Sequence, residues 1–437
     1  MAVSKMLSFL KEKSKSTLIK NLSIVFSESI ITRSLSFAII LFLARELGPE
    51  EYGKYSFIFI VVTFCSSFFD FGMENTAVRF LARNKEKKNS IFGLYFLAKA
   101  VITIVTLLCL GIFGKYIFAA MHKESIVQYM MFLIMGLVGE SLFFINDTYL
   151  QAVQRFKLRA SINISRYAIV LAFIVILYFK KLMLLKFVFC MYIIVLIFCL
   201  TFVPTYISFI RGYLKTKMNS SLVKEIFSYQ KWMFVLSIAT NTLGRIDFFM
   251  LSLWVSYSDL GIYNAANQLS TIVSFIPLAL GKVLLPKVAE MKPDEVFSFT
   301  YKTFKPLIIS CTCLLITIPV VKPLVPFFLG SKYVPSIPIF QVFLLISIIC
   351  IMLMVVEISL YSLGKPQVVT YGKYYQIGIN IILNILTIPR FGMIWAAINL
   401  TIARIIYGIV LIVLFFKYRK ASLLKAQMEV SSNEEAR

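Results

Sequence analysis

The sequence predicts an all-α integral membrane protein with about twelve transmembrane helices in two six-span halves. Three observations predict this fold class. Hydrophobic residues make up 59% and charged residues 15% of the 437 residues, against about 45–50% and about 25% in soluble domains. Apolar runs long enough to cross about 30 Å of hydrocarbon as helices recur from the first twenties to Phe416. The chain also repeats itself weakly between its halves.

These runs divide the chain into five parts. A basic N-terminal segment at 1–21 precedes an N-terminal lobe at 22–209, and a basic link at 210–228 leads to a C-terminal lobe at 229–416 and a tail at 417–437. The predicted spans lie at residues 22–45, 53–78, 91–113, 127–150, 163–179, 186–209, 229–254, 261–286, 303–321, 335–361, 367–388 and 392–416. The connections are short, and none of them can hold a soluble domain.

The first residues lack the features of a signal peptide. Residues 1–20 are basic, but Lys11, Glu12, Lys13 and Lys15 interrupt their apolar residues, so there is neither a continuous apolar core nor a cleavage site. An amphipathic segment lying on the cytoplasmic headgroups fits this pattern.

Alternate loops are rich in Lys and Arg. The basic set consists of the N-terminus, 79–88, 155–159, the link at 210–228, 282–302 and 417–420. The opposing loops, such as Glu46 to Glu51, are poorer in basic residues, and Gly48-Pro49 is expected to shape a turn there. The positive-inside rule therefore predicts a multi-pass membrane protein with both termini in the cytoplasm. The Lys180-Lys181 pair is the discordant loop.

The formal net charge of +24 follows from the same loops. Membrane topology and attraction to anionic lipid headgroups account for Lys and Arg in short loops between apolar spans. We therefore expect anionic membrane lipids as partners and no nucleic acid.

No metal site, cofactor or disulfide framework is expected. The seven cysteines form an odd, scattered set inside apolar segments, and His122 is the only histidine, so Cys311 and Cys313 have no second pair of ligands. The sequence also lacks a Gly-Lys-Ser/Thr loop that would cradle nucleotide phosphates.

Two matches reveal the internal repeat. Gly53-Lys-Tyr55 falls on Gly261-Ile-Tyr263 at a shift of about 208 residues, and Gln154-Arg155 falls on Gly364-Lys365 at about 210. Both shifts map the first span onto the seventh and the fourth onto the tenth. The halves are therefore expected to be inserted in the same direction and to face each other across a cleft, where transporters place their substrate.

Several motifs resemble one family. They are Leu43-Ala-Arg-Glu-Leu-Gly-Pro-Glu-Glu-Tyr-Gly-Lys-Tyr55, Asp70-Phe-Gly-Met-Glu-Asn-Thr-Ala-Val-Arg79, Arg245-Ile-Asp247, Leu260-Gly-Ile-Tyr-Asn-Ala-Ala266 and Leu285-Pro286. Together with the span count and spacing, they resemble the polysaccharide-unit flippases, known as the Wzx or O-antigen transporter family of the MOP superfamily. Related exporters share the Leu-Gly-x-x-x-x-Gly-x-Tyr theme, so each motif alone is less specific than the set.

The resemblance implies more than composition and spacing indicate. It implies a MATE-like fold of two six-helix bundles around a central cavity. It also implies a flippase, not an enzyme, that moves polyprenyl-diphosphate-linked oligosaccharide from the cytoplasmic to the periplasmic leaflet by alternating access. Such a protein would serve the synthesis of a surface polysaccharide, such as the O-antigen of lipopolysaccharide, and polymerase machinery would be a further partner.

Arginines inside the spans are the first candidates for substrate binding. A charge at bilayer depth costs at least about 2.5–3.5 kcal/mol, so a cavity or pathway role is its default interpretation. The candidates are Arg33, Arg166, Arg245 and Arg404. Under the repeat, Arg245 maps onto Phe37, one helical turn from Arg33, so both halves would present a guanidinium group to the cleft. A guanidinium group binds diphosphate oxygens bidentately. The alternatives are ion pairs that fix helix packing and, for Arg166, snorkelling to the interface.

Acids and one lysine complete the predicted site. The acids are Glu28, Glu140, Asp147, Asp247 and Glu357, of which Asp147 and Glu357 occupy repeat-related positions. Desolvated carboxyl groups can exchange protons during a transport cycle, but they can equally act as neutral hydrogen-bond donors or as partners of the arginines. Lys373 has aromatic neighbours that could stack on a sugar, although such residues are also common at membrane interfaces.

Two other functions stay open at this point. A MATE-like multidrug or metabolite antiporter would share the fold, but a cation exporter should have unpaired acids at mid-depth, where arginines are at least as prominent here. A membrane-embedded glycosyltransferase or polymerase usually needs a large extramembrane loop with carboxylates or histidines, and the predicted connections are too short for one.

Overall fold

The computed structural model describes residues 2–215, 220–289, 291 and 293–435. The side chains of residues 2–19 and 420–435 lie outside this description, as do those of 214–220 in the basic link, those of 274–283 and 285–287 in the C-terminal lobe, which include the Leu285-Pro286 motif, and those of some scattered single positions. The amphipathic character predicted for the segment 1–21, and much of the charge of the link and the tail, therefore falls outside the described residues.

The described residues form α-helices and short 3-10 helices and contain no β-strand. Contacts divide the chain into two compact units, Met1–Asn241 and Thr242–Arg437. The prediction of an all-α fold is confirmed.

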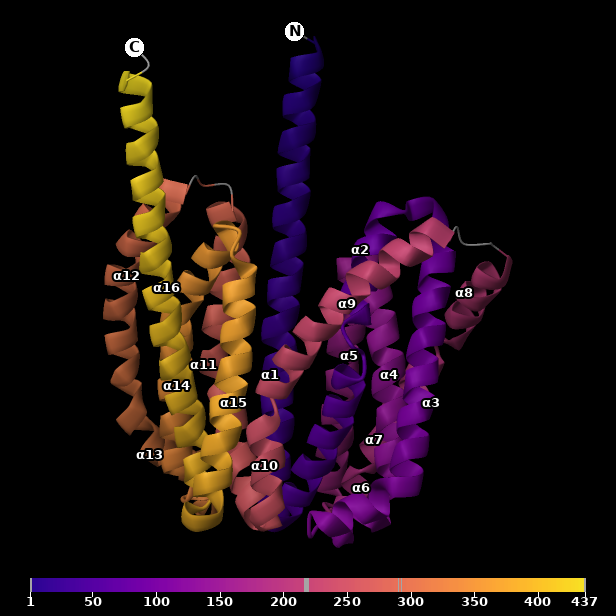
Figure 1. The fold of residues 1–437 in the computed structure, drawn as a ribbon. Helices are drawn as coiled ribbons and strands as arrows, with labels where there is room; N and C mark the ends of the chain where they lie inside the picture. The colour runs from indigo at the N-terminus through magenta and orange to yellow at the C-terminus, as the bar shows by residue number, and fades with distance from the viewer. Residues whose placement is uncertain (1, 216–219, 290, 292, 436–437) are drawn as a thin grey trace. The chain divides into compact units, whose positions relative to one another are not determined.

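In unit 1, α4 is the central helix and contacts α1, α2, α3, α5 and α7 (Figure 1). The helices are α1 (Ala2–Phe68), α2 (Met73–Arg83), α3 (Lys88–Ala120), α4 (Met130–Ala152), α5 (Phe156–Phe179), α6 (Leu185–Val188), α7 (Cys190–Leu200), α8 (Val203–Lys215) and α9 (Ser220–Leu243), which belongs to unit 1 as far as Asn241. Small residues let α4 and α7 approach closely, because a Cβ atom at Gly136 would lie 2.7 Å from the Tyr192 ring.

In unit 2, α14 holds the equivalent central place and contacts α11, α12, α13, α15 and α16. The helices are α10 (Ile246–Trp254), α11 (Tyr257–Ala289), α12 (Pro293–Leu315), α13 (Thr317–Leu329), α14 (Ser336–Ser362), α15 (Pro366–Phe391) and α16 (Met393–Glu435). Glycines again allow close packing, since a Cβ atom at Gly372 would lie 2.6 Å from the Tyr407 ring and one at Gly408 would lie 2.7 Å from Leu353.

Helices long and apolar enough to cross a membrane are present in both units. In the described part there are six, or seven if the broken pair α9–α10 forms one span: Ser23–Phe68, Lys88–Ala120, Glu124–Ala152, Phe156–Phe179, Ser336–Ser362 and Met393–Arg419, with Ser221–Leu243 and Ile246–Trp254 as the pair. The predicted sixth span is instead interrupted at the α6–α7 and α7–α8 junctions, and the ninth at the α12–α13 junction. The protein is a multi-pass membrane protein.

The first two predicted spans meet inside α1. Gly48 has φ 72° and ψ 173°, a conformation that glycine adopts without the steric penalty of a side chain, and Pro49 then begins the next helical stretch. The turn expected from Gly48-Pro49 therefore interrupts the helix at the predicted place.

The second predicted span, at 53–78, does not continue to its expected end. α1 stops at Phe68, and α2 begins at Met73 after a turn in which Phe71 and Gly72 have φ values of 51° and 77°. Asp70 Oδ2 accepts a hydrogen bond from the backbone N of Glu74 at 2.9 Å, which satisfies one of the amide groups left open at the start of α2. The helix is thus interrupted at Asp70 and Gly72, which lie inside an otherwise apolar run.

The ends of α4 and α14, which the predicted repeat relates to each other, have the same backbone capping motif. α4 and α14 both end in a capping motif whose residues differ in number by 210, with Gln154 and Gly364 at the positive-φ position (58° and 71°). The amide-to-carbonyl pairs are Val153 to Tyr149, Gln154 to Gln151 and Arg155 to Leu150 in unit 1, and Leu363 to Ser359, Gly364 to Tyr361 and Lys365 to Leu360 in unit 2. The same motif also ends α3 and α5, with His122 (φ 54°) and Lys181 (φ 56°) at the positive-φ position, so the repeat predicted from Gln154-Arg155 and Gly364-Lys365 stays a prediction.

Candidate functional site

One network of polar side chains links three helices of unit 1. Asn163 Nδ2 on α5 donates to Glu28 Oε1 on α1 at 2.7 Å and to Asp147 Oδ1 on α4 at 3.4 Å. Arg159 on α5 contacts both oxygens of Asp147, with Nε at 2.7 Å and Nη2 at 2.8 Å. This bidentate geometry compensates the carboxylate charge. The predicted acids Glu28 and Asp147 are thus brought together, and Asn163 is the residue that joins them.

Arg166 forms a second polar contact between α4 and α5. Its guanidinium group is hydrogen-bonded to the carboxylate of Glu140 in a buried ion pair and lies 4.1 Å from the ring centroid of Phe143. Two predicted site residues are therefore each other's partners. The remaining unit 1 candidate, Arg33, lies on an exposed face of α1.

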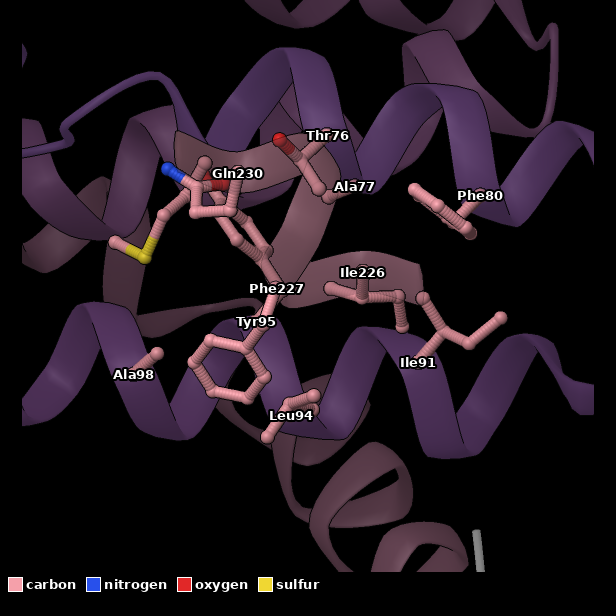
Figure 2. A pocket seen from close by; sticks show the side chains of 11 residues that line it. Thr76, Ala77, Phe80, Ile91, Leu94, Tyr95, Ala98, Ile226, Phe227 and Gln230 are labelled. Atoms are coloured by element: carbon pink, nitrogen blue, oxygen red, sulfur yellow. The ribbon is translucent and has the colours of Figure 1, made fainter. Parts of the chain in front are cut away.

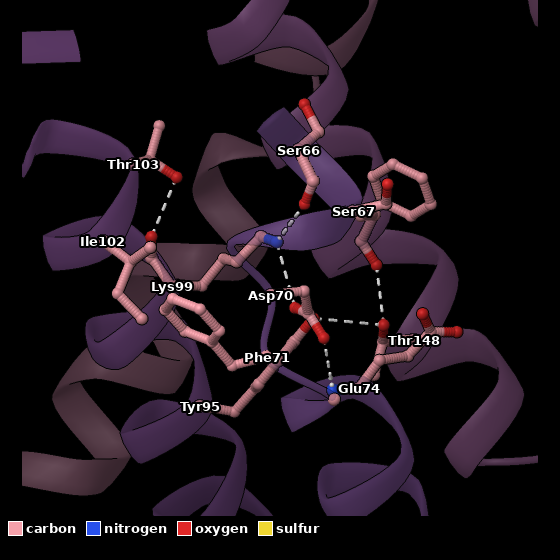
Figure 3. Close-up of polar contacts among 12 residues, drawn as sticks. Ser66, Ser67, Asp70, Phe71, Glu74, Tyr95, Lys99, Ile102, Thr103 and Thr148 are labelled. Carbon is pink, nitrogen blue, oxygen red and sulfur yellow. Dashed lines mark hydrogen bonds and ion pairs between the residues drawn. The ribbon is translucent and has the colours of Figure 1, made fainter. Parts of the chain in front are cut away.

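A third polar cluster forms where α1 ends (Figure 3). Lys99 on α3 donates to the Ser66 carbonyl O at 2.7 Å and to Asp70 Oδ1 at 3.0 Å, and its side chain is only 2% exposed. The last carbonyl groups of a helix lack intrahelical partners, and Lys99 satisfies one of them. Lys99 therefore stabilises the helix break and does not extend to the lipid headgroups.

The middle and the C-terminal end of α9 are docked onto the same turn. Asn241 Nδ2 donates to the Ser67 carbonyl O at 3.0 Å, and Gln230 Nε2 donates to the Phe71 carbonyl O at 2.7 Å. Gly72 is required at this approach, because a Cβ atom there would lie 2.6 Å from the Met233 carbonyl O. Side-chain amides of α9 thus complete the hydrogen bonding of the α1–α2 turn.

Two cavities of opposite character lie along α9. The first, of about 260 Å³, is called the polar cavity, and its polar lining consists of Ser66, Ser67, Asp70, Glu74, Asn75, Ser237, Thr240 and Asn241. The second, of about 90 Å³, lies between α2, α3 and α9 and is lined mainly by apolar side chains such as Phe80, Ile91 and Phe227 (Figure 2).

Unit 2 contains a chain of buried amides that ends on Asp247. Asp247 Oδ1 on α10 accepts hydrogen bonds from Asn380 Nδ2 at 2.7 Å and Asn384 Nδ2 at 3.5 Å, both on α15. Asn384 also donates to Asn380 Oδ1 at 2.6 Å, and Asn399 Nδ2 on α16 donates to Asn384 Oδ1 at 2.8 Å. In the described part of the chain no Lys or Arg forms an ion pair with Asp247. Its carboxyl group is held by amides alone.

The cationic side chains predicted as site residues in unit 2 differ from Arg166 of unit 1 in their partners. Arg404 Nε on α16 is buried without a hydrogen-bond partner among the described residues, although its charge acts on Asp247. Arg245 occupies the break between α9 and α10, and Lys373 is half-buried on α15. Neither forms an ion pair with a described acid. The predicted acid Glu357 instead accepts a hydrogen bond from the Tyr407 hydroxyl at 2.7 Å.

The chain matches the sequence model of one family over residues 18–292, which is more than half of its length. That family is described as polysaccharide biosynthesis protein. The chain belongs to this family. The resemblance that the motifs predicted is therefore confirmed. One relative, an uncharacterized membrane protein of Methanocaldococcus jannaschii, is 25% identical over 197 residues, which are 42% of this chain and 38% of that protein. The match thus spans less than half of the relative's length.

Solved structures with the same fold come from two groups of transport proteins. The lipid II flippase MurJ, in an inward closed conformation, superposes with a TM-score of 0.72 at 15% identity, over 89% of this chain and 86% of MurJ. An inward-facing multidrug resistance MATE family transporter of the MOP superfamily has a TM-score of 0.65 at 12% identity, over 90% of this chain and 96% of its own. Identities this low show the fold alone, and the predicted MATE-like fold class is confirmed for this member of the polysaccharide biosynthesis family.

Amide side chains are what the sequence-based prediction missed. Asn163, Asn380 and Asn384 donate to the predicted acids, Asn399 donates to Asn384, and Arg159 is the partner of Asp147. The spacing of Asn380 and Asn384, one helical turn apart in an apolar run, is the signal that could have identified them. Among the described residues, no group of three His, Cys, Asp or Glu side chains could hold a metal ion.

Proposed function

We propose that the protein is a flippase that moves polyprenyl-diphosphate-linked oligosaccharide from the cytoplasmic to the periplasmic leaflet by alternating access. Its role would be in the synthesis of a surface polysaccharide such as the O-antigen of lipopolysaccharide. The match of residues 18–292 to the polysaccharide biosynthesis family carries this proposal. The fold shared with the lipid II flippase MurJ supports it, because that protein's name states a lipid-linked cargo.

The distribution of compensated charges supports an anionic cargo. A diphosphate binds best to cations that have no other anion, and charge-assisted bidentate contacts to guanidinium are the strongest available. Arg166 already has Glu140 as its partner, whereas Arg245 and Arg404 form no ion pair with a described acid. We therefore assign diphosphate binding first to Arg245 and Arg404, with Lys373 and the exposed Arg33 as further contacts. Arg166 then serves as a positioning residue.

The remaining expectations belong to the same proposal. Both termini would lie in the cytoplasm of a cell with an inner membrane, where anionic lipids contact the basic loops. Polysaccharide polymerase machinery would receive the glycan after transfer. The cargo then crosses the bilayer without any covalent change, which accords with a protein that is not an enzyme.

A MATE-like antiporter is the second candidate, and one observation favours it. Asp247 is buried and has no Lys or Arg ion-pair partner among the described residues, so it is available to a proton or another cation during a transport cycle. The same group would couple a flippase to an ion gradient. Asp247 therefore bears on the energy source and does not by itself identify the cargo.

Disrupting the gene in its own host separates the two functions. A flippase predicts that polyprenyl-linked oligosaccharide accumulates on the cytoplasmic side and that surface polysaccharide is lost, with both restored by the wild-type gene. Leaflet location would be measured by access of a glycan-oxidising or glycan-cleaving reagent to inverted and right-side-out vesicles. No accumulation, together with new sensitivity to toxic compounds, would reject the flippase in favour of the antiporter.

A further inference from the structure

We propose that the polar cavity between the α1–α2 turn and α9 binds a sugar residue of the cargo and selects neutral or amino sugars over uronic acids. This inference rests on the proposed flippase function, which leaves the recognised sugar open. The cavity lies entirely within unit 1, since every residue that lines it precedes Thr242.

An unpartnered hydroxyl group points to a ligand in this cavity. Ser66 lines it, is only 2% exposed, and its Oγ has no hydrogen-bond partner among the described residues. Buried polar groups are nearly always hydrogen-bonded, because a buried group without a partner loses its interactions with water. A ligand hydroxyl, able both to donate and to accept, would supply the missing partner.

The lining has the composition that suits a sugar. Hydroxyl and amide groups of Ser67, Asn75, Ser237 and Thr240 stand beside the ring of Phe144. The hydroxyl and amide groups can exchange hydrogen bonds with sugar hydroxyls, and the aromatic ring offers an apolar surface for the C–H face of a pyranose. The volume of about 260 Å³ is far above the roughly 10–15 Å³ that one water needs. The cavity therefore has room for a group larger than a single bridging water.

The charge of the residues that line the polar cavity determines which part of the cargo can bind there. The ionisable groups that line the cavity are Asp70 and Glu74, both acids, and the nearby cation Lys99 is already bound to Asp70 and to the end of α1. A diphosphate or a uronic acid would meet like charge there, whereas hydroxyl and ammonium groups would find acceptors. The apolar cavity on the other side of Gln230 offers almost no polar partners, so the sugar belongs to the polar one.

The test is flipping in proteoliposomes of one defined polyprenyl-diphosphate series that differs only in its sugar: a neutral hexose, an amino sugar or a uronic acid. Ser66→Ala should slow flipping of the neutral and amino compounds by about 3- to 10-fold, the loss of one hydrogen bond. Its unfolding temperature should stay the same or rise, because the substitution removes an unpaired buried hydroxyl. Thr240→Val should slow the same substrates, and Glu74→Gln should speed up the uronic acid compound relative to the wild type.

Matched controls lie in unit 2. Thr312→Val removes a hydroxyl that, like that of Thr240, donates to the carbonyl four residues earlier. Ser252→Ala removes a buried hydroxyl that already has the Phe249 carbonyl O as a partner. Neither should change sugar preference. Equal flipping of all three sugars by wild type and by the cavity variants would overturn the sugar site and leave the flippase intact.

The two proposals can fail separately. Binding of the water-soluble oligosaccharides to the purified protein is measured alongside flipping. Sugar binding that depends on Ser66, without flipping of any compound, would reject the flippase and retain the site. Neither binding nor flipping by the wild type would reject both.

Discussion

At the scale of single residues, some buried charges have an oppositely charged partner and others do not. Substituting one member of a buried ion pair is expected to destabilise the protein. Arg166 and Glu140 neutralise each other in a buried pair between α4 and α5. Removing one partner of such a pair typically costs about 3–5 kcal/mol, because the other charge is left buried and unpaired. Arg166→Gln should therefore lower the unfolding temperature and the protein level, as measured by heating in detergent and by immunoblot.

The double variant Glu140→Gln/Arg166→Gln is the control for this interpretation. It should recover most of the lost stability, because no unpaired charge remains and the two amides can hydrogen-bond to each other. If Arg166→Gln keeps normal stability but loses export, Arg166 contacts the substrate and is more than a partner of Glu140.

Glu74 is expected to make the stability of the protein depend on pH. It lies on α2, outside the helices that are long enough to cross a membrane. Burial, reinforced by Asp70 and Asp147 and opposed by Arg159 and Lys99, raises the pKa of Glu74 from 4.5 to about 7. A raised carboxyl pKa means that the folded protein binds this proton more tightly than the unfolded chain does. The contribution to stability is therefore full below about pH 4.3, decreases as the pH rises, and is lost above pH 7.

The predicted decrease can be measured directly. Between pH 5 and pH 8 the wild type should lose on the order of 1–3 kcal/mol of stability through this group, and Glu74→Gln should remove that part of the pH dependence. Chemical unfolding in detergent at several pH values gives the comparison. Glu225→Gln, at an exposed glutamate of α9, is the matched control and should leave the profile unchanged. A profile that Glu74→Gln does not flatten would contradict the assignment.

At the scale of elements, the turn between α1 and α2 is the most constrained junction in unit 1. Gly72 combines φ 77° with a backbone approach by Met233, so a methyl group meets both a strained conformation and a carbonyl at 2.6 Å. Left-handed backbone costs about 1–2 kcal/mol per non-glycine residue before any clash is counted. Gly72→Ala should therefore lower the unfolding temperature and make the middle of α9, around Met233, more accessible to protease.

Gly111 supplies the comparison for that substitution. It lies in α3, and a Cβ atom there would meet nothing within 4 Å. Gly111→Ala should be neutral or stabilising, because alanine favours a helix by up to about 1 kcal/mol over glycine. If both variants were equally stable, the contact between α9 and the turn would not be a constraint on the fold.

The elements show clearly what could be predicted from sequence. Apolar runs located the long spans, and Gly48-Pro49 located one turn. The break after Phe68 was missed, because Asp70 and Gly72 interrupt the apolar run only briefly and the partners that stabilise the break lie on α3 and α9. The local sequence pattern does not indicate contacts with residues that are far away in the chain.

The candidate site was predictable in part for the same reason. A charge in an apolar helix is visible in the sequence, so the acids and arginines were found. Their partners were not, since Asn163 and Glu28 are far apart in the chain and Asn380 carries no charge. Pairing also depends on which faces of two helices meet. The sequence therefore suggested equal roles for Arg166 and Arg404, whereas the structure gives only Arg166 an ion-pair partner among the described residues.

At the scale of the whole molecule, the two units handle their buried charge differently. In unit 1, two of the buried acids have an arginine as ion-pair partner, Asp147 with Arg159 and Glu140 with Arg166. In unit 2, Asp247 is held by amides while Arg245 and Arg404 form no ion pair with a described acid. The two units thus share a capping motif at the ends of α4 and α14 but differ in how their buried charge is compensated. This asymmetry favours unit 2 as the half that binds the diphosphate.

The difference between the two units predicts how loss of each unit 2 arginine affects export. Arg245→Ala and Arg404→Ala should each slow export by about tenfold or more, the loss of a charge-assisted hydrogen bond worth about 1.5–3 kcal/mol. Neither should lower the unfolding temperature as Arg166→Gln does, since neither leaves a described acid without an ion-pair partner. Arg390→Ala, at an exposed arginine in the last turn of α15, is the control for loss of positive charge alone. Surface polysaccharide and flipping rates measure the effect, and normal export by both variants would remove the cationic site from unit 2.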